Sequence, residues 1–195
     1  RFGRIATVGF NPDGFGHAAG LPQILVRTGL PRYVFMRPQV HEADLPRIFA
    51  IYNREVEEGI ATFDVEPRIA GVDDAWLGGR DVQHPVLVAV DDTGDVIGWA
   101  SIGPWSPRGA YRRTGEVSVY VDETARGGGV GGTLLGALVE RARGSEIKVL
   151  LARVALPNPA SIAVHEAHGF RSFGTQRRCG EKLGRILDVE LLDLH

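Results

Sequence analysis

The sequence predicts a mixed α/β fold in which helices flank a central sheet. Stretches whose apolar residues recur at helical spacing alternate with short β-branched runs of strand length. A glycine-rich turn joins one of these strands to a helix. The expected order is strand, helix, short helix, three strands, helix, strand, helix and two strands, which is the alternation of a layered α/β protein.

The first half of the chain begins with a strand over 33–37. Asp44 is the expected cap of a helix that ends near Glu58, before Gly59. One face of this helix is apolar and carries Leu45, Ile48, Phe49, Tyr52 and Val56. Residues 73–80 predict a short helix weakened by glycine, and residues 86–90 and 95–102 predict a hairpin around the turn at 92–94. The arginine- and proline-containing stretch 103–113 predicts a surface loop.

The second half contains the glycine-rich turn. A β-branched strand over 117–121 precedes five glycines in the six positions 127–132, and a helix is expected over 133–143. Residues 149–155 read as a buried strand. Asn158 followed by Pro159 is a helix start, and Gly169 is the corresponding stop. Strands over 170–175 and 186–192 complete the chain.

Composition narrows the function classes. The chain has 195 residues with 22 basic and 24 acidic side chains, a net charge of −2, which argues against a nucleic-acid partner. Its sequence has no run of 18 apolar residues, so we expect no membrane partner. A single cysteine, Cys179, offers neither an internal disulfide nor a cysteine-based zinc site, and we expect no metal and a cytoplasmic location.

Residues 1–35 differ from the rest of the chain. They carry four arginines, one aspartate, no lysine and no glutamate, and the one methionine of the chain, Met36, follows them. We expect residues 1–35 to be a non-native or poorly ordered extension, and residues 36–195 to form the functional domain.

The glycine-rich turn predicts an anion site, because its backbone N–H groups meet the positive end of a helix dipole. Its spacing formally fits the dinucleotide pattern, but too few residues follow and the acidic ribose partner is missing. A P-loop would require a lysine. The segment from Arg126 to Gly131 satisfies the acetyl-coenzyme A pattern [R/Q]-x-x-G-x-[G/A]. A flexible turn without a ligand is the structural alternative.

Several further motifs occur in the same order as in one family. They are residues 51–53, Ala61-Thr62-Phe63-Asp64, residues 98–100, Arg108-Gly109-Ala110-Tyr111, residues 114–121, Asn158-Pro159-Ala160-Ser161, residues 165–170 and residues 182–189. Across nearly all of 36–195 the sequence resembles the GNAT acetyltransferases, and within them the phosphinothricin and methionine sulfoximine N-acetyltransferases. The resemblance implies a GNAT fold with a mostly antiparallel sheet, acetyl-CoA as donor, a small amine as acceptor, and a homodimer.

Acetyl transfer to an amine requires a base, a donor to the developing oxyanion, and a proton for the leaving thiolate. The resemblance places Glu116 as the base, acting through water; a strand-edge charge is the alternative. His165 occupies the position from which this family protonates the thiolate, although it could instead be a structural histidine.

The resemblance also implies an acetyl-CoA site. Its residues are Val119, Tyr120 and Val121 on the strand, Arg126, Gly127, Gly128, Gly129, Val130, Gly131 and Gly132 in the turn, and Asn158 and Ser161 on the following helix. Backbone groups of Val119 and Val121 are expected to face the acetyl carbonyl and the pantetheine arm. Asn158 could serve equally as a helix cap.

The acceptor is expected to meet Thr62, Phe63, Arg108, Tyr111 and Lys182. A guanidinium suits a carboxylate or phosphinate, so Arg108 is the expected clamp, with a solvated basic loop as the alternative. Phe63 could wall an apolar pocket or belong to the core. Glu181 and Ile186 depart from the family pattern, which carries an aromatic residue and a tryptophan at these positions.

The sequence thus predicts an N-acetyltransferase that moves an acetyl group from acetyl-CoA to a small amino acid or analogue by direct attack in a ternary complex. Two alternatives stay open. One is a GNAT enzyme with another acceptor, such as a polyamine or a protein N-terminus, and the other is an acyl-CoA-binding module without catalysis.

Overall fold

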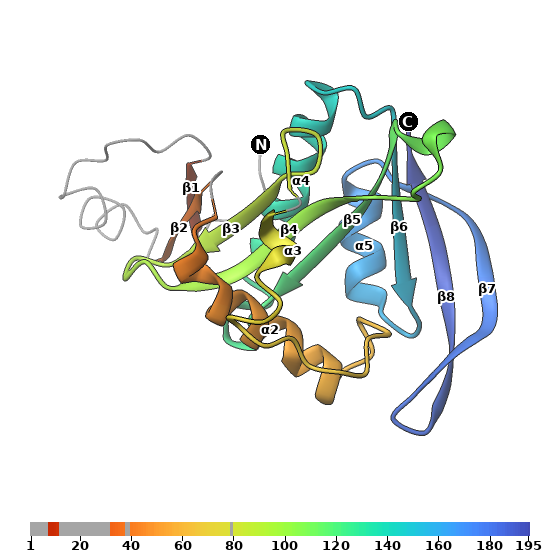
Figure 1. Cartoon of the computed structure of the whole chain (residues 1–195), viewed down its shortest axis with the longest axis horizontal. Helices are drawn as coiled ribbons and strands as arrows, with labels where there is room; N and C mark the ends of the chain where they lie inside the picture. The colour runs from red at the N-terminus through yellow and green to blue at the C-terminus, as the bar shows by residue number, and fades with distance from the viewer. Residues whose placement is uncertain (1–7, 12–31, 38–39, 79) are drawn as a thin grey trace, which may run out of the picture.

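A computed structural model describes residues 8–11, 32–37, 40–78 and 80–195. Within these residues, eight strands form one sheet in the order β1-β2-β3-β4-β5-β6-β8-β7 (Figure 1). The strands are β1 Val8–Asn11, β2 Arg32–Arg37, β3 Val86–Val90, β4 Val96–Pro104, β5 Thr114–Val121, β6 Val149–Ala155, β7 Arg171–Lys182 and β8 Arg185–Leu194. Only the β1–β2 and β5–β6 pairs are parallel among them, which confirms the expected mostly antiparallel sheet.

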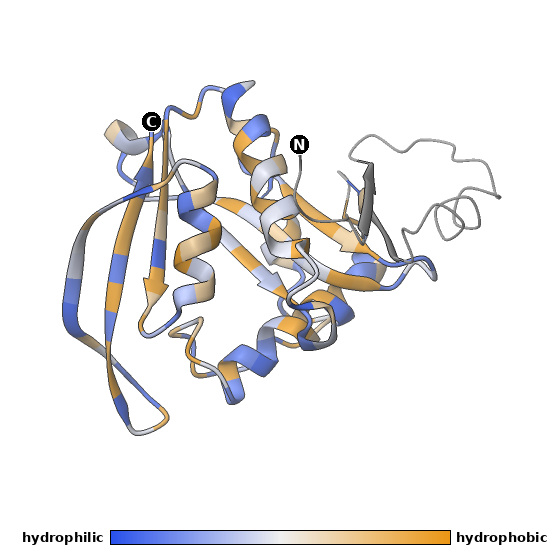
Figure 2. Ribbon diagram, turned by 180° about the vertical axis from the view of Figure 1, so that it is seen from behind, coloured by the Kyte–Doolittle hydropathy of each residue, from blue (hydrophilic) through white to orange (hydrophobic). Residues whose placement is uncertain are grey.

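The helices cover both faces of this sheet. They are α2 Leu45–Glu57, α3 Ala75–Gly78, α4 Val130–Arg143 and α5 Pro159–Ala167, with short 3-10 turns at Glu42–Asp44, Gly109–Tyr111 and Glu123–Ala125. On one face α4 and the sheet enclose a core that includes Leu134, Leu135 and Leu138. On the other face α2 packs against Val88, Trp99 and their neighbours. Figure 2 shows the hydrophobic residues on the central strands and on stripes of the helices, as expected for a three-layer domain.

Most expected elements are present, and the differences have local causes. Strands Val86–Val90 and Val149–Ala155 match the prediction. Helix α4 begins at Val130 rather than at residue 133, because Gly129 adopts the left-handed conformation and the helix starts directly after it. The last two strands are longer than the apolar pattern predicted, because pairing between β7 and β8 extends through polar, exposed residues.

Asp44 occupies the N-cap position of α2, but its carboxylate does not cap that helix. It accepts hydrogen bonds from the backbone N–H of His41 and from the Arg37 guanidinium, at 2.9 and 2.6 Å. The apolar face of α2 is buried as predicted.

Residues 1–7 and 12–31 lie outside the described part of the chain, which bears on the expectation for residues 1–35. Of that segment, the structure describes two pieces: β1, which pairs in parallel with β2, and residues 32–35 at the start of β2. The expectation that 36–195 is the functional domain stays a prediction, and a chain that starts at Met36 tests it by its folding and activity.

The arrangement of β5 and β6 positions the functional site. The two strands pair in parallel only from Thr114 to Glu116 and from Val149 to Leu151. Beyond Glu116 they separate, although both continue for several residues (Figure 1). In the described residues, the β6-facing backbone groups of the later part of β5 therefore have no ladder partner and face an opening.

Candidate active site

A cleft of about 1330 Å³ occupies the opening between β5 and β6. Its walls come from β5, β6, the start of α4, α5, the end of α2 with the loop after it, and a few residues of β7 and β8. This volume exceeds the roughly 300–1,000 Å³ of a pocket for one drug-sized ligand. The cleft has room for a long nucleotide-type molecule together with a second small substrate.

One end of the cleft is the glycine-rich turn. Gly127 and Gly129 have φ angles of +76° and +85°, a conformation that other residues adopt only at a cost. This backbone brings the start of α4 to the cleft, and among the described residues no side chain caps the helix. The first-turn N–H groups are therefore available to an anion, as a pyrophosphate site requires. Of the turn residues predicted to bind acetyl-CoA, Gly127, Gly129, Val130, Gly131 and Gly132 line the cleft, whereas Gly128 does not.

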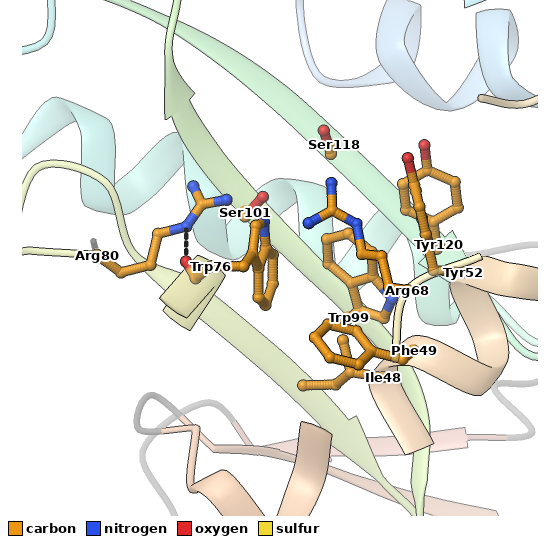
Figure 3. Close-up of a pocket in the computed structure, with 10 residues that line it drawn as sticks. All are labelled: Ile48, Phe49, Tyr52, Arg68, Trp76, Arg80, Trp99, Ser101, Ser118 and Tyr120. Carbon is orange, nitrogen blue, oxygen red and sulfur yellow. Dashed lines mark hydrogen bonds between the residues drawn. The ribbon is translucent and has the colours of Figure 1, made fainter. Parts of the chain in front are cut away.

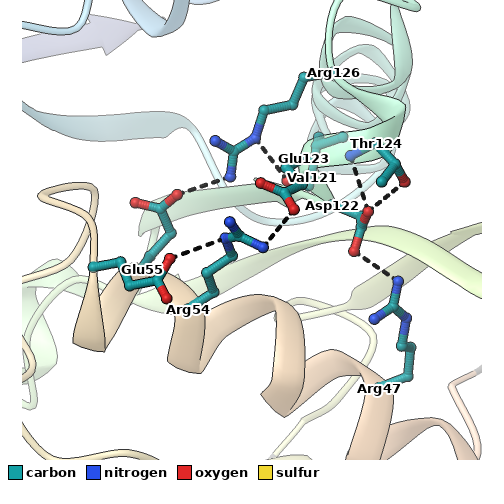
Figure 4. A network of polar contacts seen from close by, with 9 residues as sticks. Arg47, Arg54, Glu55, Val121, Asp122, Glu123, Thr124 and Arg126 are labelled. Carbon is teal, nitrogen blue, oxygen red and sulfur yellow. Dashed lines mark hydrogen bonds and ion pairs between the residues drawn. The ribbon is translucent and has the colours of Figure 1, made fainter.

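Arg126 lies at the rim of this turn and is held in place. Its Nε donates to the carbonyl oxygen of Val121 at 3.0 Å, and its Nη2 donates to Oε1 of Glu55 at 2.8 Å (Figure 4). The contact between Arg126 and Glu55 is one of three neighbouring ion pairs. In the other two, Arg54 pairs with Glu123 at 2.5 Å and Arg47 pairs with Asp122 at 2.6 Å. Three ion pairs thus fix α2 against the segment that follows β5, and Arg126 keeps a half-exposed guanidinium at the cleft.

Glu116 lies on β5 where the two strands part, and it lines the cleft. Its carboxylate accepts two hydrogen bonds from Arg153 on β6, from Nε to Oε1 at 2.5 Å and from Nη2 to Oε2 at 3.0 Å. The Arg153 guanidinium also lies over the Trp105 ring, 5.4 Å from its centre. The carboxylate is therefore oriented by a two-pronged contact whose partner is itself held on an aromatic face.

His165 on α5 also lines the cleft and is buried, with 6% of its surface exposed. Its Nδ1 is 2.8 Å from the carbonyl oxygen of Ser161, and because a carbonyl only accepts, Nδ1 carries the proton. Burial, assisted by the nearby His168, lowers the pKa of His165 below its usual value. The neutral ring therefore has a free Nε2 lone pair, which suits accepting a proton better than donating one.

Asn158 and Ser161 open α5, and both line the cleft. The Asn158 side chain accepts a hydrogen bond from the Ser161 backbone N–H at 3.1 Å, so it is a helix cap. Its amide nitrogen is not used in that bond and is left to donate to a ligand.

Thr62 and Phe63, which the sequence predicts to contact the acceptor, both line the cleft. The Thr62 hydroxyl is 2.7 Å from the Tyr52 hydroxyl, and Tyr52 donates to Asp64 at 2.6 Å, so this segment is fixed to α2. Phe63 is 40% exposed and packs on Gly180 of β7, where a Cβ atom would lie 2.2 Å from the ring. Phe63 is therefore a wall of the cleft rather than a core residue.

Three residues that the sequence predicts to contact the acceptor do not line the cleft between β5 and β6. They are Lys182, Arg108 and Tyr111. The Lys182 ammonium is buried and donates to the carbonyl oxygens of Glu55 and Thr62, each at 2.7 Å. Burial lowers the pKa of this ammonium. Lys182 thus joins the end of β7 to the end of α2 and to the loop that contains Thr62. Arg108 caps the exposed 3-10 turn that contains Tyr111. The loop predicted over 103–113 is present from residue 105 to residue 113, because β4 continues through Pro104.

Sequence reasoning missed Arg153 and Glu55. Arg153 is a charged residue in an otherwise apolar strand, and that isolated charge was the available signal. Its pairing with Glu116 depends on the parallel register of β5 and β6, which the sequence does not show. Glu55 lies on the polar side of α2, where carboxylates are common and carry no distinguishing pattern.

Neither a candidate metal-binding cluster nor a helix able to span a membrane occurs in the described residues. These residues contain no group of three or more histidine, cysteine or carboxylate side chains that could hold a metal ion. The helices in this part of the chain are all too short or too polar to cross a bilayer.

Two strands that separate at a carboxylate, beside a glycine-rich helix start that can hold a pyrophosphate, define the class of enzymes that transfer an acyl group from coenzyme A. The model of the Acetyltransferase (GNAT) family matches residues 45–170, and the chain belongs to this family. It is an acetyl-CoA-dependent N-acetyltransferase.

The chain is similar to named relatives over most of its length. It is 42% identical over 154 residues to an L-methionine sulfoximine/L-methionine sulfone acetyltransferase from Pseudomonas aeruginosa, covering 78% of this chain and 90% of the relative. A phosphinothricin acetyltransferase from Sinorhizobium meliloti, solved with acetyl-CoA, superimposes with a TM-score of 0.76 at 34% identity, covering 83% and 87% of the two chains. A ribosomal-protein-alanine N-acetyltransferase from Brucella melitensis gives a TM-score of 0.77 at 42% identity, covering 82% and 98%.

Proposed function

We propose that the protein acetylates the amino group of a small amino acid or analogue, such as methionine sulfoximine, methionine sulfone or phosphinothricin. The observation that carries this proposal is that Glu116, the glycine-rich turn, Thr62 and Phe63 all line the same cleft. The names of the relatives support the choice of acceptor.

Bound acetyl-CoA supplies an activated thioester carbonyl, and the residues of this chain supply the rest. The turn from Arg126 to Gly132, together with the start of α4, holds the pyrophosphate. Asn158, Ser161 and the backbone of Val119 and Val121 lie along the cleft where the arm and the acetyl group bind. Glu116, held by Arg153, accepts through water the proton that the acceptor ammonium loses.

His165 takes a second proton-handling role in this proposal. With Nδ1–H bound to Ser161 and a lowered pKa, its Nε2 accepts a hydrogen bond or a proton within the cleft. Donation to the leaving thiolate would first require protonation of Nε2, which burial opposes. We therefore assign His165 to the path by which the proton leaves the acceptor amine, because its unprotonated Nε2 can accept that proton.

The test is release of free thiol from acetyl-CoA with a panel of acceptors. The panel contains methionine sulfone, methionine sulfoximine, phosphinothricin, spermidine and a peptide with an N-terminal alanine. The likeness to a ribosomal-protein-alanine N-acetyltransferase makes the peptide the second candidate acceptor. Preference for the amino acids supports the proposal, and preference for the peptide would replace it. Tight acetyl-CoA binding without thiol release would indicate a non-catalytic binding module.

We further propose that two copies of the chain associate as a homodimer through the β7–β8 hairpin and that the enzyme acts in the cytoplasm. Phe173, Leu183 and Ile186 are apolar and more than half exposed on this hairpin. Leu183 and Ile186 lie together at the tip of the hairpin, and Phe173 lies near its other end. Neighbouring exposed apolar side chains are usual at interfaces and unfavourable in water. The exposed free thiol of Cys179 agrees with a reducing compartment. Sedimentation of wild type and of Ile186→Glu tests the dimer, which the variant should dissociate.

A further inference from the structure

A second cavity of about 90 Å³ lies between α2, α3 and strands β4 and β5 (Figure 3). We call it the inner pocket; its lining includes Arg68, Trp76, Arg80, Trp99, Ser101 and Ser118. Tyr52, Arg68, Ser118 and Tyr120 line both the inner pocket and the large cleft. The inner pocket is therefore an extension of the cleft.

The polar groups of the inner pocket are mostly hydrogen-bond donors. Arg68 and Arg80 contribute guanidinium groups, and Ser101 and Ser118 contribute hydroxyls that can also donate. The Trp99 side chain is buried, with 4% exposed, and its indole N–H has no hydrogen-bond partner in the described part of the chain. An unsatisfied buried donor of this kind is unfavourable, and an acceptor atom of a ligand would offset that cost.

The positive charge in the inner pocket is poorly compensated. Within the described residues, Arg80 donates only to backbone carbonyls, from Nη1 to Ile102 at 2.9 Å and from Nε to Trp76 at 3.3 Å. Arg68 contacts Asp64 at 3.5 Å, and Asp64 already accepts from Tyr52. Both guanidinium groups lie over the Trp76 ring, 4.7 and 5.9 Å from its centre. Burial and the charge of Arg68 accordingly lower the pKa of Arg80.

The inner pocket reaches β5 at Ser118, two residues along the strand from Glu116. In the register of β4 and β5, Ser101 is opposite Ser118 and Gly103 is opposite Glu116. A Cβ atom placed on Gly103 would lie 3.6 Å from Nη1 of Arg80 and 3.9 Å from the Glu116 carbonyl oxygen. Adjacent strands are about 5 Å apart, so a small amino acid with its amine beside Glu116 can reach the inner pocket.

We propose that the inner pocket holds an oxyanion of the acceptor, a carboxylate or a phosphinate, through Arg80, Arg68 and the neighbouring donors. This inference rests on the proposed function, because it assigns a part of the same acceptor. Two guanidinium groups match the paired oxygens of such a group. A water molecule occupies about 30 Å³, so the inner pocket admits a group of a few heavy atoms and not a whole second substrate. The oxyanion is either the α-carboxylate or the end of the acceptor side chain.

Kinetics of Arg80→Gln with three acceptors distinguish these two sources. Methionine sulfone carries the α-carboxylate, its α-amide lacks it, and phosphinothricin adds a side-chain oxyanion. We expect Arg80→Gln to raise KM at least 10-fold for the acceptor whose oxyanion enters the inner pocket and less than 3-fold for the matched acceptor without it. Arg80→Lys should recover part of the loss. An equal change in KM for all three acceptors would overturn the proposal.

A binding measurement keeps the inner pocket testable even if none of these amino acids is a substrate. Dimethylphosphinate, which has no amine, should raise the Tm of the wild-type protein in a concentration-dependent way, because it binds only the folded state. The shift should be lost in Arg80→Gln, reduced in Arg80→Lys, and retained in Arg143→Gln, which changes an exposed arginine on α4. No shift in the wild type, or the same shift in Arg80→Gln, would overturn the proposal.

Discussion

The guanidinium of Arg153 binds the carboxylate of Glu116 across the point where β5 and β6 separate. Two hydrogen bonds, 2.5 and 3.0 Å long, join residues that are 37 positions apart in the chain. The parallel register that pairs Glu116 with Leu151 brings Arg153, two residues further on, beside the carboxylate. The ion pair therefore fixes the proposed base at the point where the two strands begin to separate.

Replacement of Arg153 by glutamine should lower kcat on the order of 10-fold. Glutamine cannot make the two-pronged contact, so the Glu116 carboxylate loses its fixed orientation. The KM for acetyl-CoA should change by less than about threefold, since Arg153 is remote from the glycine-rich turn. Steady-state thiol release measures both constants, and Arg153→Lys should recover part of kcat. A wild-type kcat in Arg153→Gln would show that the ion pair does not position Glu116.

Replacement of Arg126 by alanine should raise the KM for acetyl-CoA roughly 10-fold at low salt. The half-exposed guanidinium at the rim of the pyrophosphate site supplies a charge-assisted contact worth about 1.5 kcal/mol, and added salt screens it. Arg47→Ala is the matched control, because Arg47 belongs to the same network but lies outside the cleft. If both variants bind acetyl-CoA equally well at all salt concentrations, Arg126 has no part in donor binding.

Replacement of Gly180 by alanine should displace the Phe63 ring and alter acceptor binding. The added methyl group would lie 2.2 Å from the ring, which is the movable end of a side chain, so the ring shifts and the fold survives. We expect a change of at least fivefold in acceptor KM with little change in acetyl-CoA KM. Gly174→Ala on the same strand has open space around its Cβ and is the control. Equal acceptor KM values for the two variants would remove Phe63 from the acceptor wall.

His165 predicts a loss of stability at mildly acidic pH. Its pKa is lowered in the folded protein, so as the pH falls through the unfolded value near 6.5 the unfolded chain binds more protons. Stability is therefore unaffected by this group above about pH 7 and decreases below about pH 6.5. Thermal unfolding between pH 7.5 and 5.5 measures the decrease, which should be smaller in His165→Gln. An identical pH dependence in His165→Gln and wild type would contradict the assignment.

Much of the fold followed from local patterns. The run from Val149 to Ala155 and the cap at Asn158 are fixed by neighbours in sequence, and both were predicted at their observed positions. The extent of β7 depends on pairing with β8, because its own exposed polar residues lack an apolar alternation. Strand pairing is a tertiary property that local patterns do not encode.

The candidate site also contains residues that local motifs identify and residues that only the tertiary structure brings together. The glycine-rich turn and Glu116 were identified from contiguous motifs and line the cleft. Arg153 and the inner pocket were not identified, because they assemble residues from separate elements. Lys182 was assigned to the acceptor from a motif, but its ammonium serves two backbone carbonyls. A motif places a residue near the site without showing which way its side chain points.

The most direct test of the account is the rate of thiol release by Glu116→Gln with methionine sulfone and phosphinothricin as acceptors. If Glu116 is the base, kcat should fall by about 10²- to 10⁴-fold, while acetyl-CoA binds with wild-type affinity. Wild-type turnover of these acceptors by Glu116→Gln would contradict the account.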